Sequence, residues 1–150
     1  MFATFLRIMK LKTLTPTLSL VAVASAAGPA VAAAAPVSIT GFSVSPACVT
    51  PGGTVTATAT VQNTTGFPVS FYSQSWVTEG GVTVYRGGAQ GAYNAPAYVP
   101  VTQSQNVQIP SYTPWGYYTL NLGVGPSSSD ATSWSQRSAP LTVSPYCWFH

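Results

Sequence analysis

Two cysteines are the residues of this chain whose chemistry is most readily assigned. Cys48 follows the first strand-like segment and Cys147 lies close to the C-terminus. In an exported protein such a pair forms a disulfide, and two cysteines allow only one intramolecular pairing. It would close a loop of about 100 residues, which contributes ~4–5 kcal/mol in the chain-entropy model. Two free thiols and an intermolecular bridge are the less favoured alternatives.

Acid–base and metal chemistry have few candidate residues. Glu79 and Asp130 are the only carboxylates after residue 34, and both fall in predicted turns. A glycosidase needs two carboxyls about 5–10 Å apart across a sugar. The single histidine, His150, is the final residue, and frayed termini rarely hold a general base in place. Two cysteines and one histidine are too few ligands for a metal site. We therefore expect no catalytic activity, no metal and no cofactor.

Aromatic side chains form the larger candidate set. Four Trp, eight Tyr and four of the six Phe follow residue 34. A domain of this size can bury only part of them, because the polar edge of a Tyr or Trp ring usually stays in contact with water. Those that fall in irregular segments or in outward phases are the candidate ligand-binding residues: Tyr85, Tyr93, Tyr98, Tyr112, Trp115 and Tyr117. Their flat faces could stack on the C–H faces of sugars. The alternative is that they pin a long loop onto a sheet.

Residues 1–34 are predicted to be a secretory signal peptide. Arg7, Lys10 and Lys12 make a basic start, residues 14–27 are apolar, and the small residues 30–34 offer cleavage sites. We expect cleavage after residue 32, 33 or 34, with translation starting at Met1 or Met9. The alternative is an uncleaved anchor. Proline, serine and glycine interrupt the apolar run, which falls short of the ~20 continuous residues that a span needs.

The net charge depends on whether this leader is counted. The whole chain carries +3, and the three basic residues of the leader account for all of it. In the remainder, Arg86 and Arg137 balance Glu79 and Asp130. A neutral domain does not attract phosphates, so we expect no nucleic acid partner. With the leader removed, we expect no membrane contact either.

The remaining residues, 35–150, have the size of one domain and a strand-rich composition. Alternation and turn residues predict about seven strands, at 37–45, 54–62, 69–77, 82–86, 105–109, 115–124 and 139–144. Residues 87–103 read as a long, weakly patterned loop. This spacing favours an all-β fold, an immunoglobulin-like antiparallel β-sandwich. In that fold part of the first strand can pair parallel with the last, which puts both cysteines at one pole. The tail 146–149 is expected to cap that pole.

Two stretches carry a resemblance to known modules. Ser45-Pro46, with Thr50-Pro51-Gly52-Gly53-Thr54-Val55-Thr56, resembles the opening of bacterial immunoglobulin-like modules, the cell-adhesion-related type included. The run 116–120, with the later Trp134 and the closing 139–143, is similar to modules appended to secreted glycoside hydrolases. Such folds place a tyrosine corner at the position of Tyr118, whereas Leu120 stands where antibody domains have a buried cysteine. The resemblance implies adhesion, spacing or polysaccharide contact.

Taken together, these features predict a secreted, extracellular, monomeric binding or surface-interaction module without catalytic activity. Its expected partner is an extracellular polysaccharide or a cell-surface protein. One alternative is a structural component of an extracellular or envelope assembly. Another is a secreted inhibitor that presents the 87–103 loop to a protease or other enzyme.

Overall fold

The computed structural model describes residues 35–126 and 134–149, which belong to one compact unit spanning 33–150. The expected leader, Asp130 and His150 lie outside the described residues. The strands are β1 (Val37–Ser45), β2 (Cys48–Val49), β3 (Thr54–Asn63), β4 (Val69–Glu79), β5 (Val82–Arg86), β6 (Gln90–Ala95), β7 (Pro100–Gln108), β8 (Gly116–Gly125) and β9 (Ser135–Val143). A short 3-10 turn, η2 (Cys147–Phe149), is the only helical element among the described residues.

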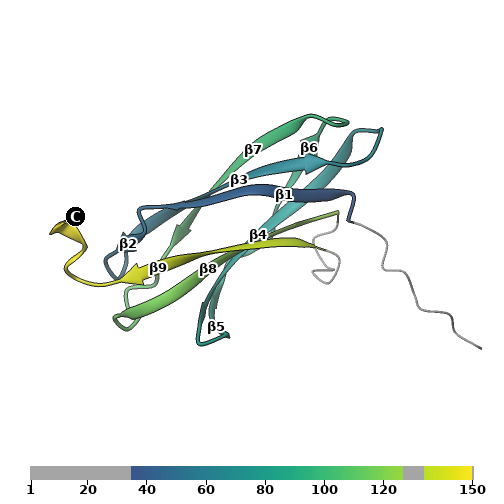
Figure 1. The fold of residues 1–150 in the computed structure, drawn as a ribbon. Helices are drawn as coiled ribbons and strands as arrows, with labels where there is room; N and C mark the ends of the chain where they lie inside the picture. The colour runs from purple at the N-terminus through teal and green to yellow at the C-terminus, as the bar shows by residue number, and fades with distance from the viewer. Residues whose placement is uncertain (1–34, 127–133, 150) are drawn as a thin grey trace, which may run out of the picture. The chain divides into compact units, whose positions relative to one another are not determined.

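The strands form two sheets that pack as a sandwich (Figure 1). One sheet has the order β1-β3-β7, and the other has the order β2-β9-β8-β4-β5, with β6 also pairing to β4. All pairings are antiparallel except that of β2 with β9, which is parallel. The all-β prediction is confirmed, and the two sheets are consistent with the expected β-sandwich.

The core follows from the alternation of side chains along the strands. On β3 the residues Val55, Ala57, Ala59 and Val61 are all fully buried, while the threonines between them face outward. On β8 the residues Tyr118, Leu120, Leu122 and Val124 are also buried. These side chains belong to two apolar clusters, each of which draws residues from both sheets. The predicted strands at 54–62 and 115–124 are therefore confirmed, and each has one buried face.

The predicted loop at 87–103 is wrong. Residues Gln90–Ala95 form β6 on the edge of β4, and β7 begins at Pro100, five residues before the predicted strand. β7 pairs with β3 from Thr54↔Gln108 to Gln62↔Pro100. Neither segment alternates clearly in sequence, since Gly91 interrupts the first and polar residues fill the second. Proline at the start of an edge strand costs no ladder hydrogen bond. The inhibitor alternative thus loses the loop on which it depended.

Smaller differences concern the ends of elements. The two-residue strand β2 lies between the predicted strands 37–45 and 54–62, and the last strand begins at Ser135 instead of residue 139. Glu79 is the final residue of β4 and not part of the turn that follows it. These three differences arise because pairing with a neighbouring strand extends strand structure beyond the residues that alternate.

The disulfide and the tyrosine corner are both present. Cys48 at the start of β2 is bonded to Cys147 in η2, with their Cα atoms 5.4 Å apart across a sequence separation of 99 residues. β2 and β9 run parallel and so end on the same side of the sandwich, as the pole-to-pole argument required. The Tyr118 hydroxyl donates to the Pro114 carbonyl oxygen at 2.8 Å, which fixes the start of β8. A register shift between Ile39 and Gly41 marks a bulge in β1.

Candidate binding site

Exposed aromatic rings gather where β7 ends, β8 begins and β9 runs into the C-terminal tail, and we call this region the aromatic end. The rings come from the loop after β7, from β8 and from the tail, and they are Tyr112, Trp115, Tyr117, Tyr146 and Trp148. Their exposed fractions are 82, 65, 85, 66 and 81% respectively. Such a concentration of exposed apolar rings on a small domain marks an interaction site more often than a scatter of single residues does.

Backbone hydrogen bonds brace the loop that carries Tyr112 and Trp115. The Ile109 N–H donates to the Gly53 carbonyl at 2.9 Å, which ties the start of the loop to the residue before β3. The Thr113 N–H closes a turn on the Pro110 carbonyl at 3.0 Å. The tyrosine corner then holds the last part of the loop. Both rings therefore project from a fixed backbone, which reduces the entropy lost when a ligand binds.

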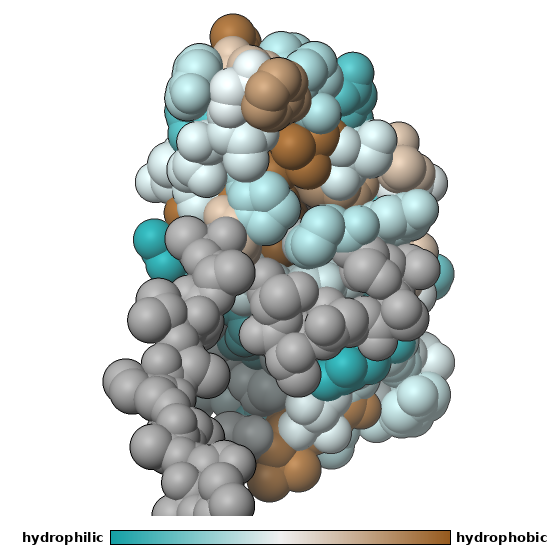
Figure 2. Space-filling view, turned by 90° about the vertical axis from the view of Figure 1, so that its right-hand side faces the viewer, coloured by the Kyte–Doolittle hydropathy of each residue, from teal (hydrophilic) through white to brown (hydrophobic). Residues whose placement is uncertain are grey.

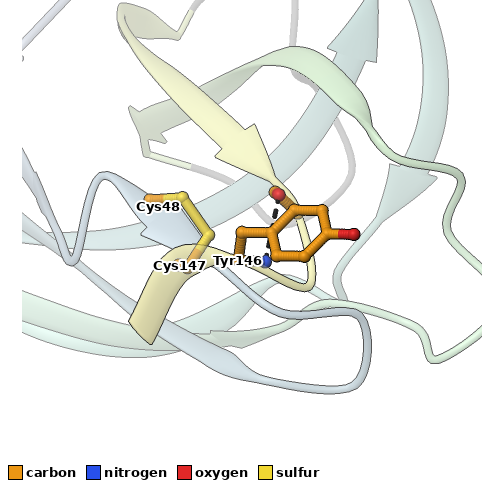
Figure 3. The surroundings of a disulfide bond; sticks show 4 residues. Cys48, Tyr146 and Cys147 are labelled. Carbon is orange, nitrogen blue, oxygen red and sulfur yellow. Dashed lines mark hydrogen bonds between the residues drawn. A yellow bond between two sulfur atoms is a disulfide. The ribbon is translucent and has the colours of Figure 1, made fainter. Parts of the chain in front are cut away.

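The C-terminal tail is fixed to the same end of the domain. The Ser144 N–H donates to the Val49 carbonyl at 3.0 Å, the Tyr146 N–H donates to Ser144 Oγ at 3.2 Å, and the disulfide follows at once. Figure 3 shows the Tyr146 ring turned away from the disulfide. That ring meets Trp115 edge to face, with centroids 6.2 Å apart. The tail lies at the expected pole, but the Tyr146 and Trp148 rings remain exposed. They are therefore members of the candidate site, although the sequence analysis did not include them in it.

The six aromatic residues predicted to bind ligand do not form one platform. Tyr112, Trp115 and Tyr117 lie exposed at the aromatic end. Tyr85 is half-buried on β5 and packs against the core cluster beneath that end. Tyr93 on β6 packs on Phe71, with ring centroids 5.5 Å apart, and Tyr98 lies between β6 and β7 at the opposite end. The alternation of residues along a strand indicates that a ring points outward. It does not indicate at which end of the sandwich that ring will lie.

A cavity of about 160 Å³ opens at the aromatic end, lined by residues of β4, β5, β8 and β9 and of the loop after β7. Val77, Ile109 and Val143 are buried members of its lining, and Tyr112 and Glu79 are exposed ones. Burial raises the pKa of the Tyr118 hydroxyl in this cavity, and the nearby Glu79 carboxylate adds to that effect. A second hollow of about 270 Å³ lies beside the disulfide and is lined by Trp148. No sequence pattern pointed to the first cavity, because its walls come from segments that are distant in the chain, whereas residues 46–54 and the disulfide-linked tail line the second.

Trp76 and Trp134 serve as packing residues. Trp134 is nearly buried against Gly123 and Gly125 of β8, and Trp76 also contacts Gly123. Arg86 lies over the Trp76 ring, 5.6 Å from its centroid. These two indoles therefore cover the outer face of β8 and are not available to a ligand in the way that Trp115 is.

The domain surface carries little charge or strong polarity. Figure 2 views the domain from the end opposite the C-terminus, and its coloured surface is mostly pale, with hydrophobic residues near the upper and lower margins. Within 35–126 and 134–149, no three side chains among His, Cys, Asp and Glu come together as metal ligands. The helical residues in those ranges include no segment long and apolar enough to span a bilayer.

The sequence matches no protein-family model, and no curated protein matches it. Solved structures match the fold at low identity. A cycloisomaltooligosaccharide glucanotransferase from Paenibacillus, complexed with cycloisomaltoheptaose, matches with a TM-score of 0.57 and 18% identity over 72% of this chain. A β-glucosidase from Erythrobacter marinus matches with a TM-score of 0.53 and 10% identity over 73% of this chain. An alkylpurine DNA glycosylase from Pseudomonas fluorescens, bound to DNA with an abasic site analogue, matches with a TM-score of 0.50 and 18% identity over 73%.

This chain spans only a small part of each of those proteins. It covers 14% of the glucanotransferase, 16% of the glucosidase and 30% of the glycosylase. At these identities the likeness concerns the fold alone: a β-sandwich that occurs as one part of larger bacterial enzymes.

Proposed function

We propose that this chain is a secreted, non-catalytic module that binds an extracellular polysaccharide through its aromatic end. The observation that carries the proposal is the group of exposed rings there, with Trp115 and Tyr146 in contact and Tyr112, Tyr117 and Trp148 around them. Flat rings offer apolar faces to the C–H faces of sugars, and tyrosine hydroxyls can hydrogen-bond sugar hydroxyls.

The charge of the domain supports a neutral ligand. After residue 34 the chain has two arginines and two carboxylates, so no electrostatic field favours an anionic partner. Binding would therefore depend on stacking and neutral hydrogen bonds, and its affinity would change little with salt. A neutral glycan makes no demand for charge on the protein, which fits this composition better than a nucleic acid does.

Secretion is part of the proposal. The disulfide is the type of bond that persists in an oxidising compartment, and the predicted signal peptide would deliver the chain there. Two of the matched structures are enzymes that their names connect with carbohydrate, and the matched part is a small share of each. That association supports a glycan ligand here without assigning an activity to this chain.

The test is binding of the oxidised domain, beginning near Pro36, to insoluble polysaccharides and to isolated cell walls. We expect saturable binding that Trp115→Ala weakens at least tenfold while the thermal unfolding temperature stays unchanged. Phe67→Ala is the matched control, because Phe67 is 77% exposed but lies in the β3–β4 loop at the opposite end. A folded domain that binds no glycan, or one that loses binding equally in both variants, would contradict the proposal.

A further inference from the structure

The cavity at the aromatic end combines apolar walls with a single carboxylate. Buried Val77, Ile109 and Val143 line it, as do three tyrosine rings, those of Tyr85, Tyr112 and Tyr118. It opens to solvent, since Tyr112 is largely exposed and the neighbouring lining residue Val84 is 47% exposed. An engineered apolar cavity of roughly 150 Å³ holds a benzene molecule, so this one has room for a single group of that size.

Glu79 places a negative charge in the lining. It is the only acidic side chain among the described residues, and it stands at the end of β4 beside the cavity. The two arginines of the described chain are engaged elsewhere, because Arg86 lies over Trp76 and Arg137 donates to the Gln136 carbonyl. Burial is the main cause of the raised pKa of the Tyr118 hydroxyl in this lining, and the negative charge of Glu79 raises it further.

The buried wall of the cavity offers few hydrogen-bond acceptors. Val77, Ile109 and Val143 are aliphatic and the Tyr118 hydroxyl hydrogen is committed to the Pro114 carbonyl, whereas the polar side chains of Glu79, Tyr112 and Thr113 belong to exposed or half-buried residues. A primary ammonium would bring three N–H donors into this space, and any that point at the aliphatic wall lack an acceptor, which costs free energy. A neutral apolar group would make no use of the carboxylate. A quaternary ammonium has no N–H to satisfy, presents methyl groups to the walls, and is attracted both by tyrosine faces and by a carboxylate.

We propose that this cavity binds a trimethylammonium group, of the kind that choline carries. Its methyl groups contact Val77 and Ile109, its positive charge faces Glu79, and Tyr85 and Tyr112 offer their ring faces. This ligand differs from the neutral glycan proposed above, and the cavity can be occupied whether or not the exposed rings bind sugar.

The experiment compares choline with 3,3-dimethylbutan-1-ol, which has the same shape without the charge. Binding of each to the oxidised domain is measured at low salt by chemical-shift changes of the cavity residues. We expect choline to bind at least about fivefold more tightly than the alcohol, as a cation on aromatic faces and near a carboxylate should. Glycerophosphocholine forms a further arm: tighter binding of choline indicates a free cation as the natural ligand, and tighter binding of the phosphodiester indicates a phosphate-linked substituent.

Two variants make the test specific. Glu79→Gln should remove the preference for choline over the alcohol, and Tyr112→Ala should weaken choline several-fold; both residues are exposed, so neither change should unfold the domain. Asp130→Asn removes the other carboxylate found after residue 34 and should leave the preference unchanged. Equal affinities for choline and the alcohol, or an unchanged preference in Glu79→Gln, would overturn the proposal, as would the absence of choline binding.

Discussion

Trp115 and Tyr146 meet edge to face, with their ring centroids 6.2 Å apart and their planes at 68°. Trp115 precedes β8 and Tyr146 follows β9, so this contact joins the loop before one strand to the tail after its neighbour. The adjacent disulfide from Cys147 to Cys48 holds that tail on β2. The exposed rings of the aromatic end are therefore fixed by covalent and backbone bonds, and this arrangement leads to the predictions that follow.

Reduction of the disulfide should lower both stability and ligand binding. The bond closes a span of 99 residues, so its loss should cost up to ~4–5 kcal/mol in the free energy of unfolding. Urea unfolding of the Cys48→Ser/Cys147→Ser variant against the oxidised protein measures this. The oxidised domain should also weigh two protons less than the reduced one, and equal masses would show that the bond does not form in solution.

Tyr118→Phe should destabilise the domain by about 1–3 kcal/mol, since it leaves the Pro114 carbonyl without its partner. The exposed neighbour Tyr117 provides the control, and Tyr117→Phe should change the unfolding midpoint little. If the two substitutions cost the same, the tyrosine corner does not support this loop.

The free energy of unfolding should also fall at alkaline pH because of the Tyr118 hydroxyl. Its pKa in the folded state is raised above the ordinary value of 10.0, mainly by burial and further by Glu79. The folded state thus favours the neutral hydroxyl, so its contribution to stability is complete below pH 10 and is lost as pH rises through the folded pKa. Unfolding free energies between pH 8 and pH 11 should fall less steeply in Tyr118→Phe than in the parent chain, and parallel curves would contradict this.

Asn63→Ala should destabilise the domain by about 2–4 kcal/mol. The Asn63 side chain is fully buried and donates to the Phe67 and Ala95 carbonyls at 2.7 and 2.9 Å. Its Oδ1 accepts from the N–H and the hydroxyl of Thr65, both at 2.8 Å. Thr64→Ala, at the exposed neighbour, should cost less than ~0.5 kcal/mol by comparison. A small effect of Asn63→Ala in chemical unfolding would show that these four bonds are not made together.

Gly125→Ala should disturb Trp134. A Cβ at position 125 would collide with the indole, whereas one at Gly88 would meet no atom within 4 Å. We expect Gly125→Ala to cost about 1–3 kcal/mol, as overpacking does, and to change the tryptophan emission. Gly88→Ala should do neither, and similar behaviour of the two variants would count against the described packing.

The sequence predicted those features that depend on local pattern. Val55 to Val61 alternate with threonines, and Tyr118 to Val124 alternate with smaller residues, so both strands and their buried faces were predicted correctly. Two cysteines allow only one intramolecular disulfide. The expected parallel pairing of the first and last strands then placed that disulfide at one pole of the sandwich. β6 and the first half of β7 were missed, because their strand conformation depends on pairing with β4 and β3 and not on alternation in their own residues.

The candidate site was predicted only in part for a related reason. Tyr98 and Trp115 both fall in irregular segments, and only the three-dimensional order of the strands shows that they lie at opposite ends of the sandwich. Trp148 was expected to cap the pole, yet the disulfide holds its neighbour and leaves its ring exposed. The cavity beside Glu79 forms where β4, β5 and the loop before β8 come together. No local sequence pattern predicts that these three segments are neighbours.

The measurement that most directly tests the central claim is the affinity of Trp115→Ala and of Phe67→Ala for the polysaccharide that the oxidised parent domain binds. The account predicts a loss of at least tenfold, about 1.4 kcal/mol or more, for Trp115→Ala and an unchanged affinity for Phe67→Ala, with both variants folded. Unchanged affinity of a folded Trp115→Ala variant would contradict the assignment of glycan binding to the aromatic end.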